Sequence, residues 1–307
     1  MAEPAGVTAW EARGRLLSLP QGEVWVLDQP PADDAGLDPV LLLHGFPTCS
    51  FDWRHVLPAL SRRRRVVAFD FPGFGLSAKP DRRYSLRHQA DVAESVCAAL
   101  GLGRIALVTH DMGDSVGGEL LARDLDGDLD FEISRRVLAN GSIYLELAQL
   151  TPGQLFLLDL PDARLEPPAQ RSAGERPAGE RDEGAAMRTA LAATFAPDHQ
   201  PGPDELAAQW ALIARNDGHH LLPRTIRYIE DRRAEEARFT GAIERHPSPL
   251  GVVWGDRDPI AVVAMVDRLL ERRPDATPAT LDGVGHYPMI EDPERFAAAT
   301  VRFLDGE

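Results

Sequence analysis

Short apolar runs rich in β-branched residues alternate with helical patterns along much of this chain. Residues 86–100, 114–122 and 293–303 have the apolar spacing of amphipathic helices. Strands that alternate with helices form βαβ units, and their parallel sheets are covered by helices on both faces. The pattern therefore predicts an α/β protein with a mostly parallel, twisted sheet flanked by helices. The strands are expected at residues 23–27, 40–43, 66–69, 105–108, 137–139, 251–254 and 279–281.

The alternation stops after about Tyr144 and resumes at about Leu250, which predicts an insertion between two strands. Within it, residues 205–215 and 222–236 have helical spacing. We therefore expect a core domain of residues 1–143 and 245–307 and a helical cap of residues 144–244. The stretch PPAQRSAGERPAGERDEG, within residues 161–186, is rich in Pro, Gly and charge, and we expect it to be mobile.

Composition limits the partners and the compartment. The net charge of −15 disfavours nucleic acid and anionic membranes as partners. No apolar run approaches the roughly 18 residues of a membrane helix, and the N-terminal residues lack the apolar segment of a signal peptide. Two cysteines, Cys49 and Cys97, make no disulfide framework. We expect a cytoplasmic protein, and the sequence does not indicate its oligomeric state.

The segment LVTHDMGDSVGG joins a predicted strand to a predicted helix at Asp111. A nucleophile elbow is a sharp strand-to-helix turn that exposes one side chain above a sheet, and it needs small residues two positions before and after that side chain. Thr109 and Gly113 occupy those positions. Asp is also a common first cap of a helix. This segment alone therefore leaves both interpretations open.

Further segments favour the elbow. HGFP follows the strand at 40–43, so the backbone N–H groups of Phe46 and Met112 are expected to form an oxyanion hole. VVWGDRDP ends a late strand with Asp256 and Asp258, and LDGVGHYP places His286 after the last strand. The chain order of nucleophile, acid and base is the order found in α/β-hydrolases.

With these motifs the chain resembles the α/β-hydrolase superfamily over nearly its whole length. DFPGFGLS, at residues 70–77, is similar to a further loop of that superfamily. HGFP together with HD-x-G resembles the branch of epoxide hydrolases and haloalkane dehalogenases. Within it, HGFPTCSFDW, HDMGD and HYPMIEDP are closest to the mesoderm-specific-transcript group. The resemblance implies the α/β-hydrolase fold with a helical cap inserted between strands.

The resemblance also implies which carboxylate supports His286. In the family's G-x-x-D pattern the last residue faces the histidine, which favours Asp258 and makes Asp256 a turn residue. Some dehalogenases instead carry this acid after the preceding strand, in a segment similar to NGSIYLEL. Glu146 falls near that position and stays as the alternative acid.

An aspartate at the elbow changes the chemistry that is expected. Asp has a reference pKa of about 4 and is ionised at neutral pH, so Asp111 needs no base before it attacks. Acyl transfer to a carboxylate gives a mixed anhydride, whereas displacement at a saturated carbon gives a stable alkyl-enzyme ester. His286, supported by Asp258, would then activate water to hydrolyse that ester. The sequence thus predicts a hydrolase that consumes a small apolar organic substrate and water.

The leaving group separates an epoxide hydrolase from a dehalogenase. Opening an epoxide produces an alkoxide, which needs a general acid such as a tyrosine. Tyr228 matches the place where epoxide hydrolases carry one, and Tyr144, where the cap leaves the sheet, is a second candidate; either could instead be a packed aromatic residue. Halide needs side-chain N–H donors, which Phe46 and Met112 lack. An epoxide hydrolase is therefore predicted, with a haloalkane dehalogenase-like enzyme as the alternative.

Other interpretations and residues complete the prediction. An esterase, and a hydrolase-fold protein that binds without turnover, stay as further alternatives. The substrate pocket is expected to be lined by Phe46, Met112, Phe156 and Trp210. His219 and His220 are adjacent on a predicted helix, so their rings should point in different directions, and no third ligand accompanies them. We expect no metal and no other cofactor.

Overall fold

The computed structural model describes residues 4–166 and 184–306. Its strands form one sheet in the order β1-β2-β4-β3-β5-β6-β7-β8, in which β1, β2 and β4 pair antiparallel and the remaining neighbours pair parallel. The predicted mostly parallel α/β sheet is thereby confirmed. The strands are β1 Arg15–Leu19, β2 Gly22–Gln29, β3 Val40–Leu43, β4 Val66–Phe69, β5 Arg104–His110, β6 Glu132–Ala139, β7 Leu250–Gly255 and β8 Thr277–Leu281.

Helices cover the sheet on both faces because its central strands are apolar on both faces. In β3, Leu41 and Leu43 join the cluster of buried residues that contains α3, α4 and α9, whereas Val40 and Leu42 join the cluster that contains α1, α2 and α12. The α-helices of the core are α1 Ala5–Glu11, α2 Leu57–Leu60, α3 Leu86–Leu100, α4 Met112–Asp126, α10 Ala264–Arg272, α11 Pro288–Glu291 and α12 Pro293–Asp305.

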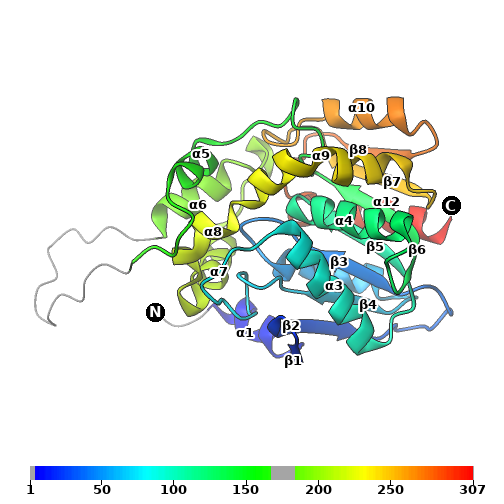
Figure 1. Cartoon of the computed structure of the whole chain (residues 1–307), viewed down its shortest axis with the longest axis horizontal. Coiled ribbons are helices and arrows are strands. Elements are labelled where there is room, and N and C mark those ends of the chain that lie inside the picture. Colours follow the sequence, from blue (N-terminus) through cyan, green and yellow to red (C-terminus); the bar gives the residue numbers. More distant parts are fainter. Residues whose placement is uncertain (1–3, 167–183, 307) are drawn as a thin grey trace, which may run out of the picture.

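Of the helices between β6 and β7, α5 to α8 gather at one end of the molecule (left in Figure 1), beyond the ends of the strands. Residues 140–249 contain no strand in the part of them that is described. The helices are α5 Pro152–Asp159, α6 Ala185–Ala192, α7 Pro203–Ala214, α8 Leu222–Thr225 and α9 Tyr228–Arg245, with 3-10 turns η2 Pro197–His199 and η3 Arg215–Leu221. Residues 167–183, which the sequence predicts to be mobile, lie outside the described residues.

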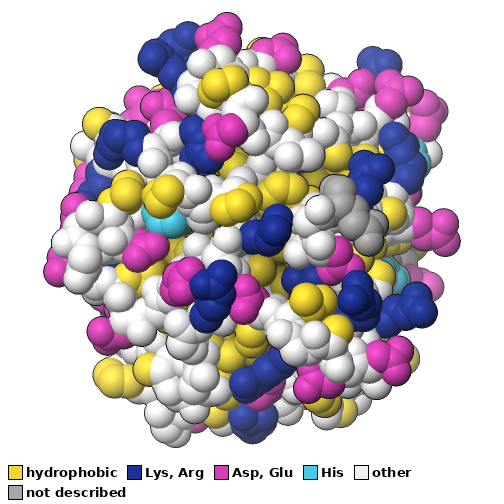
Figure 2. Space-filling view, turned by 90° about the vertical axis from the view of Figure 1, so that its right-hand side faces the viewer, with side chains coloured by type: hydrophobic (Ala, Val, Ile, Leu, Met, Phe, Trp, Pro, Cys, Tyr) yellow, Lys and Arg dark blue, Asp and Glu magenta, His cyan; other side chains and the backbone are white. Residues whose placement is uncertain are grey.

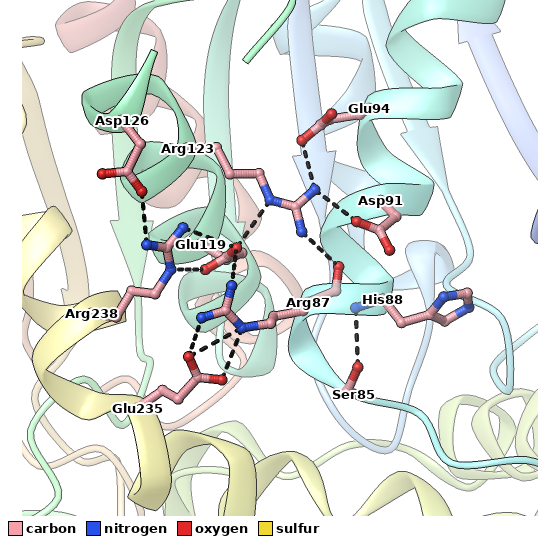
Figure 3. Close-up of polar contacts among 10 residues, drawn as sticks. All are labelled: Ser85, Arg87, His88, Asp91, Glu94, Glu119, Arg123, Asp126, Glu235 and Arg238. Carbon is pink, nitrogen blue, oxygen red and sulfur yellow. Dashed lines mark hydrogen bonds and ion pairs between the residues drawn. The ribbon is translucent and has the colours of Figure 1, made fainter. Parts of the chain in front are cut away.

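Helix α9 runs from the cap helices back over α4 of the core (Figure 1), and a buried carboxylate fixes it there. Glu119 of α4 is fully buried and accepts hydrogen bonds from Arg123 of the same helix, Arg238 of α9 and Arg87 of α3, at 3.0, 2.6 and 3.2 Å (Figure 3). A buried carboxylate is stable only when it is paired in this way. Because α9 begins at Tyr228, this network helps to set the position of that residue.

Two surface properties bear on the predicted partners. On the face opposite the cap helices, Figure 2 shows acidic and basic side chains interspersed, so the net charge of −15 forms no single acidic patch there. Across residues 4–166 and 184–306, no helix has both the length and the apolar content needed to cross a membrane.

Candidate active site

Asp111 stands at the sharp turn between β5 and α4. Its backbone has φ 50° and ψ −112°, a region that non-glycine residues rarely adopt and that costs about 1–3 kcal/mol. The turn is crowded, since a Cβ on Gly113 would lie 2.5 Å from the carbonyl oxygen of Leu43. This is the local geometry of an elbow, and the Asp111 side chain is buried within it.

The loop after β3 lies against Asp111. The backbone N–H of Phe46 donates to Oδ2 of Asp111 at 2.9 Å. Gly45 permits this approach because a Cβ there would come within 2.7 Å of the Asp111 Cβ. His44 holds the loop, accepting a hydrogen bond at Nε2 from the backbone N–H of Phe71 at 3.0 Å. The Phe46 N–H therefore lies within hydrogen-bonding distance of the Asp111 carboxylate, while the oxyanion-hole role of the Phe46 and Met112 N–H groups stays a prediction.

His286 and Asp258 form a buried pair beside Asp111. Nδ1 of His286 lies 2.8 Å from Oδ2 of Asp258. The carboxylate also accepts from the backbone N–H groups of Ile260 and Ala261, at 2.7 and 3.0 Å, and from Nδ2 of Asn140 at 2.9 Å. These bonds fix the carboxylate, and through it the imidazole ring.

Charge and burial give His286 an unusual pKa. Burial by itself would lower the pKa, but the carboxylates of Asp258 and Asp111 outweigh burial and raise it to about 9. The neighbouring His110 has its pKa lowered to about 4, chiefly by burial. Its Nε2 donates to the backbone oxygen of His286 at 2.8 Å. One histidine is thus charged at neutral pH and the other is a neutral support.

The two other acids of the sequence prediction lie elsewhere. Glu146 is largely exposed and forms an ion pair with Arg268 at 3.6 Å, so it does not reach His286. Glu146 is therefore excluded as the supporting acid, because the loop after β6 carries its side chain to the surface. Asp256 accepts a hydrogen bond from the backbone N–H of Gly283 at 2.8 Å, which is a turn contact.

The two candidate tyrosines point to different surroundings. Tyr228, at the start of α9, is buried with its ring 5.6 Å from that of Phe46, and Gln154 hydrogen-bonds its hydroxyl. Burial, followed by the nearby Asp111 charge, raises its pKa. The hydroxyl of Tyr144 instead donates to Glu244 at 3.0 Å. The geometry thus brings Tyr228 to the site and turns the Tyr144 hydroxyl away from it.

A cavity of about 300 Å³ lies between the cap helices and the site. At its inner end are Phe46, His286 and Tyr287, and the remaining wall comes mainly from the cap. Among the described residues that line it, none is acidic and none is Lys or Arg. The cap residues are Thr151, Gly153, Gln154, Phe156, Leu157, Leu160, Leu165, Ala186, Met187, Ala190, Leu191, Thr194, Trp210, His219 and Leu222, and Pro47 and Ile260 complete the wall.

Three of the four residues predicted to line the substrate pocket do line the cavity, and one does not. Phe46, Phe156 and Trp210 line the cavity, and Phe156 stands at its outer side with 65% of its surface exposed. Met112 is instead almost fully buried, with 1% of its surface exposed, and is not among the residues that line the cavity. The prediction that Met112 forms part of the wall is therefore wrong.

The adjacent histidines and Asn140 also differ from expectation. The rings of His219 and His220 lie 4.0 Å apart, against the expectation that they diverge. Neither belongs to a group of potential metal ligands among the described residues. Asn140 was missed by sequence reasoning, although it directly follows β6 and has φ 46°, a turn position that Asn tolerates. A polar residue after a buried strand was the available signal.

Comparison with known proteins agrees with this fold. LipZ of Mycobacterium tuberculosis is 40% identical over 305 residues, 99% of each chain. The mesoderm-specific transcript protein of Mus musculus is 35% identical over 276 residues, covering 87% of this chain and 78% of its own, which confirms the predicted resemblance. A solved alpha/beta hydrolase fold protein from Burkholderia ambifaria is 22% identical, covers 98% of both chains and has a TM-score of 0.72, which shows the fold alone. Residues 40–299 match the alpha/beta hydrolase family, and the chain is a member of it.

Proposed function

We propose that this protein is a hydrolase whose nucleophile is Asp111, and that it opens small apolar epoxides through an alkyl-enzyme ester. The observation that carries the proposal is the 2.9 Å hydrogen bond from the Phe46 N–H to Oδ2 of Asp111. In a serine enzyme this donor would wait for the oxygen of the substrate. Here the donor is already hydrogen-bonded to Oδ2 of Asp111, which leaves Oδ1 of Asp111 to attack.

In the first step, Oδ1 of Asp111 forms a bond to an epoxide carbon while the ring C–O bond breaks. The released oxygen carries negative charge and takes a proton from the hydroxyl of Tyr228. A buried position next to Phe46 and the Asp111 charge supports this role for Tyr228. The product of the step is a neutral ester between Asp111 and the substrate.

The second step uses His286 as the base. Forming the ester removes the Asp111 charge, which is one of the charges that raise the pKa of His286. The imidazolium then gives up its proton more readily, and this proton restores the hydroxyl of Tyr228. The neutral imidazole takes a proton from water, whose oxygen attacks Cγ of Asp111. The negative charge that develops on Oδ2 is stabilised by the Phe46 N–H. The bond between Cγ and Oδ1 then breaks, and the departing Oδ1 takes the proton of the hydroxyl group that water added to Cγ, so that the diol leaves and Asp111 is a carboxylate again. Removing one such N–H donor typically slows an enzyme about 10²–10³-fold.

The cavity supports an apolar, uncharged substrate. Its described lining lacks carboxylates and basic side chains of Lys or Arg, and most of its wall is aliphatic or aromatic. The charge of His286, at the inner end, is already offset by the carboxylates of Asp258 and Asp111. A charged substrate would therefore lose its hydration in the cavity with little gain from a partner of opposite charge.

Trapping the ester tests the proposal. His286→Gln protein, incubated with a panel of styrene-type and terminal alkyl epoxides, should gain the mass of one substrate on the peptide that contains Asp111. Asp111→Asn in the same background is the control and should gain nothing. Diol formation by the wild type without any adduct in His286→Gln would contradict the proposed ester. Halide release from chloroalkanes without diol from epoxides would favour the dehalogenase alternative.

An isotope experiment tests the second step. In a single turnover in H₂¹⁸O, the label should enter Asp111, because water attacks Cγ and the diol leaves with the original Oδ1. Label that appears first in the diol would mean that water attacks the substrate directly, and the ester mechanism would then be abandoned.

A further inference from the structure

Glu291, at the end of α11, has its carboxylate directed back at the loop that carries His286. Its Oε2 accepts a hydrogen bond from the backbone N–H of Gly285 at 2.7 Å, and its Oε1 accepts one from that of Tyr287 at 3.0 Å. The residues on both sides of His286 are thus held by one side chain. Hydrogen bonds to a charged acceptor are about twice as strong as those between neutral groups.

The same carboxylate also reaches the cap. Oε2 of Glu291 accepts a third hydrogen bond, at 2.9 Å, from the backbone N–H of Ala196, which lies between α6 and η2. Two residues earlier, the backbone oxygen of Thr194 accepts the N–H of His286 at 3.1 Å. Thr194 also lines the cavity. A segment of the cavity wall is therefore bonded directly to the loop of the proposed base.

The contact is closely packed at Gly285. A Cβ at that position would lie 2.5 Å from the Ala196 nitrogen and 2.9 Å from both carboxylate oxygens of Glu291. The charges that face the His286 ring are Asp258, Asp111 and Glu291, with the neutral ring of His110 at 5.0 Å. Glu291 is the one of these carboxylates to which the mechanism above gives no task.

We propose that Glu291 is the positioning residue of the base: it fixes the orientation of His286 for the attack of water and makes that orientation depend on the seating of cap residues 194–196. This inference rests on the proposed function, since it takes His286 to be the base that hydrolyses the alkyl-enzyme ester. Glu291 itself touches neither the substrate nor the water.

Glu291→Gln tests the inference on the two chemical steps separately. The amide can keep an oxygen toward Gly285 and Ala196, but its NH₂ group then faces the N–H of Tyr287, so one bond and the charge are lost. We expect hydrolysis of the ester to slow by about tenfold or more, while formation of the ester changes less than about threefold. Rapid-quench mass spectrometry of the Asp111 peptide measures both rates. Glu294→Gln, an exposed acid nearby, is the matched control and should change neither. Equal slowing of both steps, or of neither, would overturn the proposal.

A measurement without substrate separates this inference from the proposed function. By NMR titration, the pKa of the His286 imidazole should be lower in Glu291→Gln than in the wild type by roughly half a unit or more, because one nearby anion is gone. The shift is expected even if no epoxide ever forms an adduct with His286→Gln. An unchanged His286 pKa in folded Glu291→Gln would sink the positioning role by itself.

A second variant tests the bond to the cap and covers the case in which Glu291→Gln does not fold. Ala196→Pro removes the backbone N–H that the cap donates to the carboxylate of Glu291, and leaves the bond from Nδ1 of His199 to the backbone oxygen of Glu291 in place. The φ of −62° at Ala196 suits proline. Ester hydrolysis should slow in this variant, by less than in Glu291→Gln. A folded Ala196→Pro protein that hydrolyses the ester at the wild-type rate would show that the cap does not act on the base.

Discussion

At the carboxyl ends of the strands, the polar side chains of the candidate site are held by hydrogen bonds, whereas the cap contributes mainly a wall of apolar side chains. Asp258 accepts from His286, Asn140 and two backbone N–H groups. On the cap side, the cavity is lined by residues such as Leu157 and Leu191. The first region therefore depends on individual atoms, and the second on shape.

This difference suggests how each region contributes to function. A hydrogen-bonded carboxylate cannot be replaced without leaving its buried partners unsatisfied, so the strand ends should tolerate few substitutions. An apolar wall keeps its character when one aliphatic side chain replaces another of similar volume. We therefore expect the chemistry to be set by the sheet and the choice of substrate by the cap, with Tyr228 as the one cap residue that takes part in the chemistry.

The largest effect is expected from Asp111→Asn. The amide keeps the shape of the side chain but is a much poorer nucleophile, so turnover of epoxides should fall by at least about 10⁴-fold. The variant should keep the wild-type fold, which circular dichroism checks, and kcat is measured with the best epoxide of the panel. Turnover within tenfold of the wild type would remove Asp111 from the mechanism and shift the chemistry away from the strand ends.

Asp258→Asn should have the next largest effect. Without the negative charge, the His286 pKa falls and the ring is no longer held in the orientation that activates water, so hydrolysis of the ester should slow by about 10³-fold. The ester should accumulate during turnover, which mass spectrometry of the Asp111 peptide detects. Glu146→Gln is the matched control because Glu146 lies at the surface beside Arg268. An effect of the same size in that control would reverse the assignment of the acid.

The sheet and the residues at the carboxyl ends of its strands were largely predictable from the sequence, because each of these features arises from a short stretch of neighbouring residues. Apolar runs gave the strands, and the spacing of residues in α3 and α12 gave those helices. Strand β1 and helix α1 were missed, since β1 is exposed or half-buried throughout and has no buried face to create a pattern. Asp111, Asp258 and His286 follow strands or the last sheet segment, so their order along the chain already indicated a shared edge.

The cap was less predictable because its contacts are long-range. Nothing near Tyr144 in the sequence reveals that its hydroxyl meets Glu244, which lies 100 residues later. The burial of Met112 depends on how α4 packs on the sheet, and the bonds from Glu291 to Gly285 and Ala196 join three separate segments. Local patterns find residues that follow strands, and they do not find side chains that bridge a cap and a core.

A smaller effect, of about 10²-fold, is expected from Tyr228→Phe on the rate of ester formation. Without the hydroxyl, the ring oxygen must take on its negative charge with no proton donor, and the burst of ester formation in single-turnover experiments should slow accordingly. Tyr144→Phe should change that rate less than about threefold because its hydroxyl is bonded to Glu244. The two variants sharpen the comparison between the strand ends and the cap. A strong effect of Tyr228→Phe would show that the hydroxyl of one cap residue takes part in the chemistry, as the side chains at the strand ends do. Equal effects of the two variants would leave the cap without an assigned acid.

The smallest expected effect is on the pH dependence of the free energy of unfolding. The charged pair at the strand ends should contribute to it, and the apolar wall of the cap should not. The pKa of His286 is raised in the folded protein from 6.5 to about 9, so the folded state binds a proton more tightly than the unfolded state does. The stabilisation is complete below pH 6.5 and is lost as the pH rises through about 9, in total roughly 3 kcal/mol. Urea unfolding at intermediate pH values should therefore show that the wild type loses more free energy of unfolding between pH 6.5 and 9 than His286→Gln does. Leu157→Met, in the cap wall, should follow the wild-type curve. If the free energy of unfolding falls with pH in the same way in the wild type and in His286→Gln, protonation of His286 does not stabilise the folded state.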